Sequence, residues 1–337
     1  MEQKQKILTV SIAAYNVEPY LRKTLDSCCI PSIMDGIEVL IVNDGSKDGT
    51  SAIGHEYEAK WPGTFRVIDK ENGGYGSTVN TAMAQAKGKY FRLLDGDDWF
   101  DQEGLEKLVT FLAECEADCV LSGRLEVDAE GQTKHTDNEW FRMYAEKLNG
   151  QSRSPGELTP FIYGMWEVAY RTEMLRAHPF TLPEHMLYTD RLYVVYPIPW
   201  IRRYAFVNYD VYCYRVGHEG QSVSVENRIR HLPEIIGGFD DLVKYYGETA
   251  ERAPEANREF MKARISQYYN NVIRSLFLLP ASKKAQGQIR EIEARMKEIS
   301  PELYTYCGEN NRFIGYCRKY GYAVYWLRKT RKAENWK

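Results

Sequence analysis

Four short apolar runs in the first hundred residues, separated by longer segments, predict the strands of a sheet. The segments between them carry apolar residues at helical intervals, as Leu21, Leu25 and Cys28 do. Strands that alternate with helices are typical of an α/β fold in which helices flank a mainly parallel, Rossmann-like sheet. The four predicted strands span residues 7–13, 38–43, 65–68 and 90–94.

The pattern changes at about residue 226, where long helical periodicities begin. Apolar residues then recur every three or four positions, for example Ile265, Tyr269 and Val272. We therefore predict an α/β domain over residues 1–225 and a helical C-terminal region over residues 226–337.

Each predicted strand ends in small or polar residues. In open α/β sheets, ligands bind at the carboxyl ends of the strands, beside the loops that follow them. The four loops are therefore expected to converge on one crevice. They comprise residues 15–16, 43–46, 72–76 and 95–98.

The composition fits a folded protein and argues against several classes. The 337 residues carry a net charge of -3, so the composition lacks the overall positive charge typical of a nucleic-acid-binding protein. The seven cysteines are odd in number and lack paired CxxC spacing, which argues against a disulfide framework and favours a reducing cytoplasm. The first apolar run is too short for a signal peptide, and no later run reaches membrane-spanning length.

The strongest chemical signal is KYFRLLDGDDWF, residues 89–100, in which Asp95, Asp97 and Asp98 directly follow an apolar strand. Crowded carboxylates repel one another and lose hydration unless a cation compensates them. Asp95 and Asp97 share one side of an extended chain, and Gly96 leaves room for a ligand. We predict a Mg²⁺ or Mn²⁺ site at Asp95 and Asp97. In the alternative interpretation, Asp97 or Asp98 caps the following helix.

Two further loops contain residues that can bind a ligand. In EVLIVNDGSKDGT, Asp44 follows a predicted strand and can accept hydrogen bonds from a base or a sugar, or else form an ordinary Asx turn. In ENGGYGSTVN, Gly73, Gly74 and Gly76 precede a helix that Ser77 is predicted to cap. Their backbone N–H groups can bind a phosphate, or the segment is a plain glycine loop.

Together and in this order, these segments resemble glycosyltransferase family 2, whose members have the GT-A fold. The resemblance covers about residues 7–225 and also includes VSIAAYN near the start and YTDRLYVV at residues 188–195. It implies an inverting transferase that moves a sugar from a nucleotide-diphosphate sugar, with a UDP-sugar favoured. The implied acceptor is a hydroxyl of a glycan or a lipid-linked saccharide, as in polysaccharide synthesis at the cell envelope.

The resemblance also implies roles for individual residues. The first two loops would hold the nucleoside, and the DXD-type motif would hold the ribose and the metal that bridges the diphosphate, with Asp98 in support. Arg215, in YCYRVGHEGQSVS, would approach phosphate, or else pair with a surface carboxylate. The residues implied in nucleotide-sugar binding are Ala14, Tyr15, Asn16, Asp44, Gly74, Asp95, Asp97 and Arg215, and the implied metal ligands are Asp97 and Asp95.

Asp190 is the catalytic base that the resemblance implies. The family usually has a glutamate before this aspartate, whereas this chain has Thr189. In the alternative interpretation, Asp190 only caps the helix predicted over residues 191–196. A second departure lies in the glycine loop, where many relatives carry an arginine and this chain has Ser77 and Thr78.

Two rival functions remain open from the sequence. A metal-dependent aspartyl phosphatase also uses aspartates at a strand end, but its motif expects Thr, Ser or Val where Trp99 stands. A non-catalytic scaffold would keep the nucleotide-sugar pocket without chemistry, although the presence of Asp95, Asp97 and Asp190 argues against it. Residues 161–170, which include Trp166 and Glu167, are a candidate acceptor wall.

The segment 316–332, YCRKYGYAVYWLRKTRK, mixes aromatic and basic residues as interfacial membrane segments do. Alternatively, it forms a helix that packs its aromatic face on the protein. We expect a cytoplasmic protein, with peripheral contact at the inner face of the cell membrane and a homo-oligomer as open alternatives.

Overall fold

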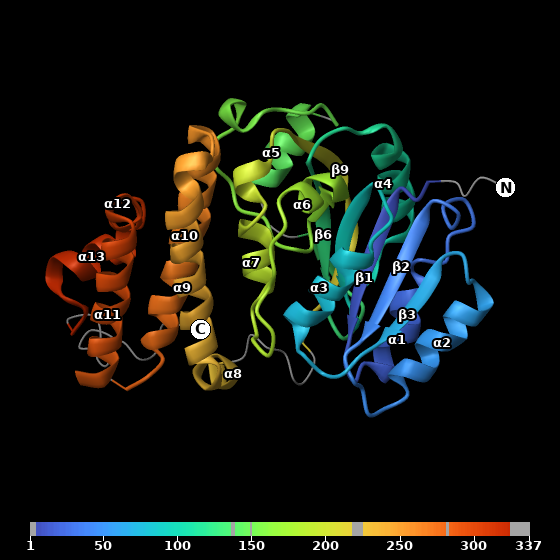
Figure 1. Ribbon diagram of the computed structural model, residues 1–337, viewed down its shortest axis with the longest axis horizontal. Helices are drawn as coiled ribbons and strands as arrows, with labels where there is room; N and C mark the ends of the chain where they lie inside the picture. The colour runs from blue at the N-terminus through green and yellow to red at the C-terminus, as the bar shows by residue number, and fades with distance from the viewer. Residues whose placement is uncertain (1–4, 136–138, 149, 218–224, 281–282, 324–337) are drawn as a thin grey trace. The chain divides into compact units, whose positions relative to one another are not determined.

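The computed structural model describes residues 5–135, 139–148, 150–217, 225–280 and 283–323 (Figure 1). The chain divides into two compact units, Met1–Glu219 and Gly220–Lys337. The domain boundary predicted after residue 225 stays a prediction.

The first unit contains a mixed sheet with the strand order β3-β2-β1-β4-β8-β6-β9-β5, and β7 pairs with β6. The first four strands are parallel, and each lies within one residue of its predicted position: β1 (Leu8–Ala14), β2 (Ile37–Asn43), β3 (Phe65–Asp69) and β4 (Tyr90–Asp95). The others are β5 (Trp99–Phe100), β6 (Cys119–Val127), β7 (Thr133–His135), β8 (Val168–Arg171) and β9 (Tyr204–Arg215).

Helices flank this sheet, as predicted (Figure 1). They are α1 (Glu18–Asp26), α2 (Thr50–Lys60), α3 (Tyr75–Gln85), α4 (Gln102–Glu114), α5 (Glu139–Leu148), α6 (Thr172–Ala177) and α7 (Asp190–Val195), with short 3-10 turns at Pro155–Glu157 and Ile198–Trp200.

Two helix starts differ from the sequence prediction. The cap of α4 is Asp101, whose carboxylate accepts a hydrogen bond from the backbone N–H of Gly104 at 2.8 Å. Asp97 and Asp98 therefore do not cap this helix. The residue that precedes α3 is Gly74, with φ 81°, so Ser77 lies inside the helix.

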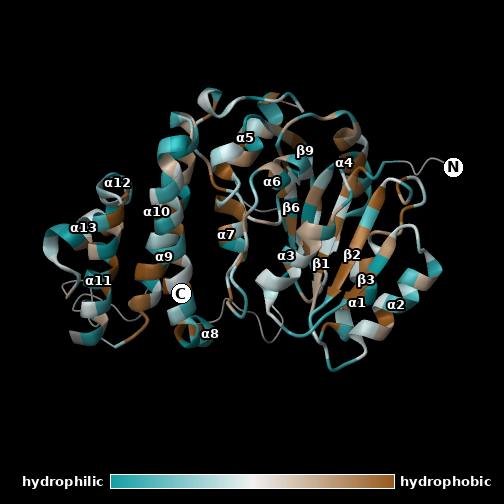
Figure 2. Ribbon diagram, in the orientation of Figure 1, coloured by the Kyte–Doolittle hydropathy of each residue, from teal (hydrophilic) through white to brown (hydrophobic). Residues whose placement is uncertain are grey.

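The core of the first unit consists of the central strands, which are hydrophobic and buried (Figure 2). Every residue of β2 is buried, and Leu8, Val10 and Ile12 of β1 are fully enclosed. Because helices cover both faces, these strands are nearly continuous apolar runs. Burial of each of these Leu, Val or Ile side chains contributes about 1.5–3 kcal/mol to the stability of the folded state.

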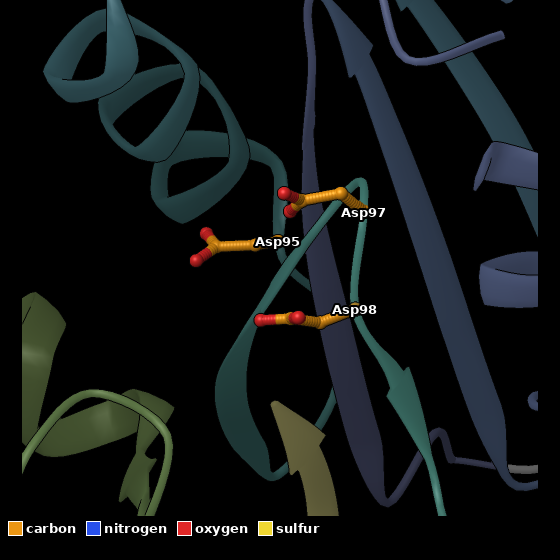
Figure 3. Close-up of side chains that lie close together, drawn as sticks. All are labelled: Asp95, Asp97 and Asp98. Carbon is orange, nitrogen blue, oxygen red and sulfur yellow. The ribbon is translucent and has the colours of Figure 1, made fainter. Parts of the chain in front are cut away.

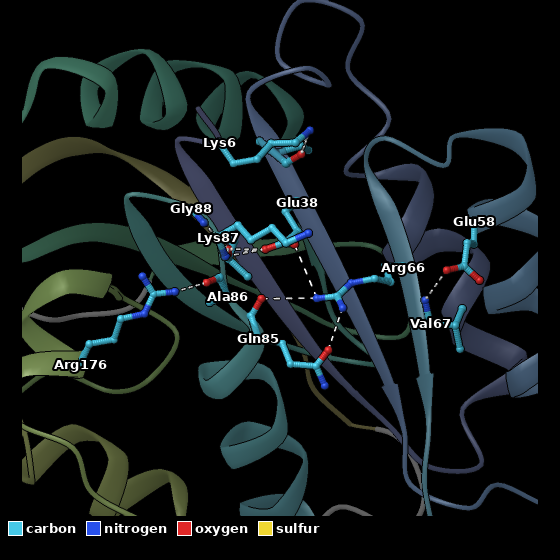
Figure 4. Close-up of polar contacts among 12 residues, drawn as sticks. Lys6, Glu38, Glu58, Arg66, Val67, Gln85, Ala86, Lys87, Gly88 and Arg176 are labelled. Carbon is cyan, nitrogen blue, oxygen red and sulfur yellow. Dashed lines mark hydrogen bonds and ion pairs between the residues drawn. The ribbon is translucent and has the colours of Figure 1, made fainter. Parts of the chain in front are cut away.

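A buried polar cluster joins the amino ends of these strands (Figure 4). The Glu38 carboxylate of β2 accepts hydrogen bonds from the Thr9 hydroxyl at 2.8 Å and from the Lys87 backbone N–H at 2.9 Å. Arg66 of β3 lies 3.6 Å from the same carboxylate, and the Gly88 N–H donates to the Thr9 hydroxyl. The cluster links β1, β2, β3 and the turn before β4.

The second unit is helical, as predicted, with α8 (Val225–Arg230), α9 (Leu232–Thr249), α10 (Glu255–Leu276), α11 (Lys283–Ile299), α12 (Pro301–Glu309), α13 (Arg312–Tyr320) and a 3-10 turn at Ala250–Arg252. Its helices hold a polar contact in which the Glu293 carboxylate accepts hydrogen bonds from Tyr269, Tyr322 and Arg318 at 2.6–2.8 Å.

Helix α13 contains the first part of the aromatic and basic segment. Ile314 and Cys317 are buried, whereas Tyr320 is 51% exposed. Residues 324–332 of that segment lie outside the described residues. Within the part of the chain that the structure describes, no helix combines the length and the apolar character needed to cross a membrane.

Candidate active site

Three carboxylates gather at the end of β4. One oxygen from each of Asp95, Asp97 and Asp98 lies within 4.8 Å of the others. Figure 3 shows the three carboxyl groups on the same side of the loop. Oxygen ligands of Mg²⁺ lie about 2.1 Å from the ion, so two of them are separated by up to about 4.2 Å. The cluster is therefore close to the size that a divalent cation requires.

The partly buried carboxyl group of Asp95 suits a bound cation. Its Oδ1 atom is enclosed and has no hydrogen-bond partner in the structure. Burial, together with repulsion from Asp98 and Asp97, raises the pKa of this carboxyl well above its ordinary value. A buried acceptor without a donor is unfavourable unless a ligand or an ion satisfies it. A divalent metal held by Asp95 and Asp97 would satisfy it.

Asp98 fixes the loop to β9. Its carboxylate accepts hydrogen bonds from the Tyr212 hydroxyl and from the Arg215 backbone N–H, both at 2.7 Å. Burial and the nearby Asp97 raise the pKa of Asp98 to about 7. The Tyr212 hydroxyl also accepts from the Asp95 backbone N–H at 3.1 Å. Both Asp98 oxygens therefore already have protein donors, so Asp98 supports the aspartate loop.

Asp190, the predicted base, is the first residue of α7, and Thr189 is the N-cap. Tyr75 connects it to the aspartates, because burial and then the charges of Asp95 and Asp190 raise the pKa of the Tyr75 phenol well above its ordinary value. The charge of Asp190 likewise contributes to the raised pKa of Asp95. The predicted base and the predicted metal ligands therefore belong to one electrostatic cluster.

Several residues in the loops of the candidate site have unusual backbone conformations. Among the described residues, the non-glycine residues with positive φ are Asn16 at 51°, His185 at 51° and Tyr188 at 63°. Asn16 follows β1, and Tyr188 precedes Asp190 by two residues. Such conformations are unfavourable for residues with a Cβ atom and are concentrated at functional sites. Their positions agree with the site that the carboxylates define.

Asp44 holds the glycine loop. One oxygen of its buried carboxylate accepts from the Gly73 N–H and from Lys70 Nζ, both at 2.9 Å, and the other accepts from the Gly74 N–H at 2.8 Å. The role predicted for Asp44, hydrogen bonding to the nucleoside, stays a prediction, since its carboxylate already has three donors.

The glycine loop also touches the segment before α7. The His185 N–H donates to the Gly73 carbonyl at 2.6 Å. A Cβ atom at Gly74 would lie 3.1 Å from the nitrogen and 3.2 Å from the Cα atom of His185. Glycine is therefore favoured at position 74 by the close approach of His185 and by the positive φ of 81°.

The first two loops are joined to each other. The Asn16 N–H donates to the Ser46 hydroxyl at 3.0 Å, and the Lys47 N–H donates to Asn16 Oδ1 at 2.8 Å. Ala14 is buried and its carbonyl accepts from the Asp44 N–H, whereas Tyr15 is 50% exposed. Tyr15 thus offers an accessible ring beside the predicted nucleoside pocket.

Arg215 lies against the aspartate loop. Its Nε donates to the Asp97 carbonyl at 2.9 Å, and its guanidinium lies 4.9 Å from the ring centres of both Tyr20 and Trp99. The predicted contact between Arg215 and phosphate stays a prediction. His218, from the same sequence motif, lies outside the described residues.

The predicted acceptor wall divides into two parts. Phe161 and Tyr163 are buried in an aromatic cluster with Tyr204, so they belong to the core. Trp166 is partly exposed, and its ring lies 5.2 Å from that of Tyr214. Trp166 therefore remains a candidate for contact with an acceptor, whereas Glu167 is buried.

Sequence reasoning did not single out Tyr75 or Tyr212 for the site. The hydroxyl of Tyr75 donates to the Met165 sulfur at 3.0 Å, which joins α3 to the segment containing Trp166. Tyr212 pairs with Asp98 across more than a hundred residues. Both tyrosines lie within motifs of the candidate site, ENGGYGSTVN and YCYRVGH. Their position in these motifs could have indicated that they belong to the site.

The parallel strands, the joined loops after β1 and β2 and the carboxylates after β4 define a GT-A type domain. Residues 9–172 match the family model described as Glycosyl transferase family 2. The chain therefore carries a glycosyltransferase family 2 domain.

Similar proteins agree with this assignment. EpsH of Bacillus subtilis (strain 168) is 29% identical over 216 residues, which cover 62% of this chain and 60% of EpsH. The chain thus spans less than two thirds of that relative. S. aureus TarS 1-349, solved with UDP, shares the fold with a TM-score of 0.68 at 18% identity, covering 98% of this chain and 93% of that one.

A second solved structure has the same fold with a metal present. The mannosyltransferase PcManGT from Pyrobaculum calidifontis, in complex with GDP-Man and Mn²⁺, has a TM-score of 0.54 at 17% identity. The match covers 98% of this chain and 89% of that one.

Proposed function

We propose that the protein transfers a sugar from a nucleotide-diphosphate sugar, with a UDP-sugar as the favoured donor, to a hydroxyl of a glycan or a lipid-linked saccharide. The observation that carries this proposal is the cluster of Asp95 with Asp97, in which the charge of Asp190 acts on Asp95. The complexes of similar folds with UDP and with GDP-Man support a nucleotide-sugar donor.

On the donor side, Asp95 and Asp97 would hold Mg²⁺ or Mn²⁺, which when bound supplies positive charge to the diphosphate leaving group. The hydrogen bonds from Tyr212 and Arg215 to Asp98 keep the loop in place. The joined loops around Asn16 and Ser46 form the rim that would receive the nucleoside.

On the acceptor side, Asp190 acts as the general base. Its carboxylate takes the proton of the acceptor hydroxyl while that oxygen forms a bond to the anomeric carbon. The bond from the anomeric carbon to the diphosphate breaks, and its electron pair leaves with the nucleotide. Attack on the face opposite the leaving group inverts the anomeric configuration.

The decisive test compares Asp190→Asn with Asp97→Ala. We expect Asp190→Asn to bind the donor normally and to lose transfer by about 10²- to 10⁴-fold, which is the usual effect of a missing general base. Asp97→Ala should lose the metal-dependent part of donor binding. Calorimetric titration of UDP-sugars with and without Mn²⁺, together with a transfer assay, measures both effects.

Asp101→Asn is the matched control, because asparagine retains the helix cap that Asp101 provides for α4. Unchanged turnover in Asp190→Asn would rule out Asp190 as the base. Release of phosphate from simple monoesters without an acceptor would indicate a phosphatase instead. Donor binding by the wild-type protein without transfer or donor hydrolysis would indicate a scaffold.

A further inference from the structure

His55 of α2 lies between two carboxylates beside the carboxyl end of β3. Its Nε2 atom is 2.7 Å from an oxygen of Asp69, the last residue of β3, and its Nδ1 atom is 3.0 Å from an oxygen of Glu58, which is three residues further along α2. A neutral imidazole has one N–H donor, whereas the protonated ring has two. Only the protonated ring can therefore donate to both carboxylates, so the geometry favours protonated His55.

The charged groups that face His55 act in the same direction. They are Asp69 from β3 and Glu58 from its own helix. The hydrogen bond to Asp69, the bond to Glu58 and the charges of both carboxylates raise the pKa of the imidazole above its ordinary value of 6.5, against the effect of burial. The His55 side chain is 50% exposed, so it exchanges protons with the solvent. The two-carboxylate arrangement is therefore present at low pH and is lost as the pH rises through the raised pKa.

Asp69 connects this histidine to the loop that follows β2. The Asp69 oxygen that does not face His55 accepts hydrogen bonds from Asn43 Nδ2 at 2.7 Å and from the Ser51 hydroxyl at 2.8 Å. Asn43 and Asp69 are register partners at the ends of two adjacent parallel strands. Asn43 is buried, and its Oδ1 atom accepts from the Ser46 N–H at 3.2 Å. The asparagine thus passes the position of Asp69 on to the loop.

The same hydrogen bonds continue into the loop that follows β1. The Ser46 hydroxyl accepts from the Asn16 N–H at 3.0 Å, and Asn16 Oδ1 accepts from the Lys47 N–H at 2.8 Å. Asn16 has a φ of 51°, a conformation that persists only where the surrounding contacts fix it. A continuous series of hydrogen bonds therefore joins His55 to the strained residue at the rim of the proposed nucleoside pocket.

We propose that His55 is a positioning residue for nucleotide binding, which acts through Asp69 and Asn43 on the loops that follow β1 and β2. Protonated His55 holds Asp69 in line with Asn43, and loss of the proton releases one of the two carboxylates. The loops are then held less firmly. The assignment of this rim to a nucleoside rests on the proposed transferase function. UDP should bind more tightly when His55 is protonated than when it is neutral.

The first test is hydrogen exchange of the peptide that contains residues 43–48, without nucleotide. Glutamine carries no charge and donates through one nitrogen, so His55→Gln corresponds to the neutral state of the histidine. After correction for the intrinsic exchange rate, protection in the wild type should fall about two- to fivefold between about pH 6 and about pH 8, the range expected of an exposed ion pair. His55→Gln should show the lower protection at both pH values.

The second test is calorimetric titration with UDP and Mn²⁺. Comparison of variant and wild type at the same pH cancels the titration of UDP and of the aspartates. His55→Gln should weaken UDP binding about two- to fivefold at about pH 6 and should have no effect at about pH 8. Glu58→Gln keeps an oxygen that can accept from the Val67 N–H, but it removes one charge that favours the imidazolium. In Glu58→Gln, the fall in UDP affinity should therefore move to lower pH, which a merely structural role for His55 does not predict.

His231→Gln is the matched control. His231 Nδ1 lies 2.6 Å from a Glu234 oxygen three residues further along, as in the pair of His55 with Glu58, and its replacement should leave both measurements unchanged. Equal exchange, or equal UDP affinity, of His55→Gln and the wild type at about pH 6 would overturn the proposal. Failure of the wild type to bind UDP would contradict the proposed donor instead. The exchange measurement needs no nucleotide and would still decide whether His55 positions the loops.

Discussion

The sequence leaves the role of Asp98 open, and the structure defines that role through its contacts. As part of DGDD it was a candidate helix cap or a supporting residue, and the structure gives the cap to Asp101. A sequence with four aspartates within seven positions does not show at which one the helix begins. The partner that gives Asp98 its supporting role is Tyr212, more than a hundred residues away, and such pairings are not encoded locally.

At the same scale, the raised pKa values make metal binding depend on pH. Burial and Asp97 raise the pKa of Asp98 to about 7, against 3.8 for an ordinary aspartate. The metal-free folded state thus holds protons that the unfolded chain has released, and its stability falls as the pH rises from 3.8 to about 7. A divalent cation held by Asp95 and Asp97 would place positive charge beside Asp98 and favour its ionised form, so the stabilising effect of the cation should increase over this range.

The measurement is the melting temperature with and without Mn²⁺ at about pH 5.5 and about pH 8. We expect the Mn²⁺-induced rise to be larger at the higher pH. In Asp98→Asn, the fall in metal-free stability with pH should be shallower, because one titrating carboxyl is gone. An equal Mn²⁺ effect at both pH values in the wild type would contradict this account.

At the scale of elements, the parallel half of the sheet was predictable and the other half was not. Strands β1 to β4 are apolar runs that end in polar loops, which is a strong local signal. By contrast, β5 has only two residues, and β8 pairs antiparallel with both β4 and β6. These pairings depend on contacts between distant segments, for which a single sequence carries little information.

The cluster around Glu38 leads to a stability prediction for these elements. Thr9→Val keeps the shape of the side chain but removes the hydroxyl that joins Glu38 to Gly88. The buried Gly88 N–H then loses its acceptor, so we expect a loss of about 1–3 kcal/mol in unfolding free energy. Urea denaturation of Thr9→Val and the wild type measures this loss in unfolding free energy.

Thr110→Val is the control for that experiment. The Thr110 hydroxyl bonds only to the Glu106 carbonyl within its own exposed helix turn, so its loss should change stability by less than about 0.5 kcal/mol. Equal stability of Thr9→Val and the wild type would show that the cluster does not stabilise the strands.

At the scale of the whole molecule, the change in periodicity near residue 226 correctly predicted a helical C-terminal region. The sequence did not show how its helices are joined. Glu293 of α11 bonds to Tyr269 of α10, to Arg318 of α13 and to Tyr322, so one carboxylate links three helices. None of these pairs is closer than 24 residues in sequence, which is why helical spacing alone did not reveal them.

We expect Glu293→Gln to loosen this unit, because the partly buried Arg318 loses the charge that compensates it. Removal of one partner from such a pair costs about 3–5 kcal/mol. Hydrogen exchange should accelerate in peptides of α11 and α13 and stay unchanged in β1 to β4. Glu291→Gln, an exposed neighbour on the same helix, is the control. Unchanged exchange in α13 would contradict the role of Glu293.

The contact between Gly74 and His185 links two stretches of sequence that are 111 positions apart. A Cβ atom at position 74 would press on the backbone of His185, which precedes the proposed base by only five positions. The glycine loop and the approach to Asp190 are therefore mechanically coupled, so a displacement of one is transmitted to the other.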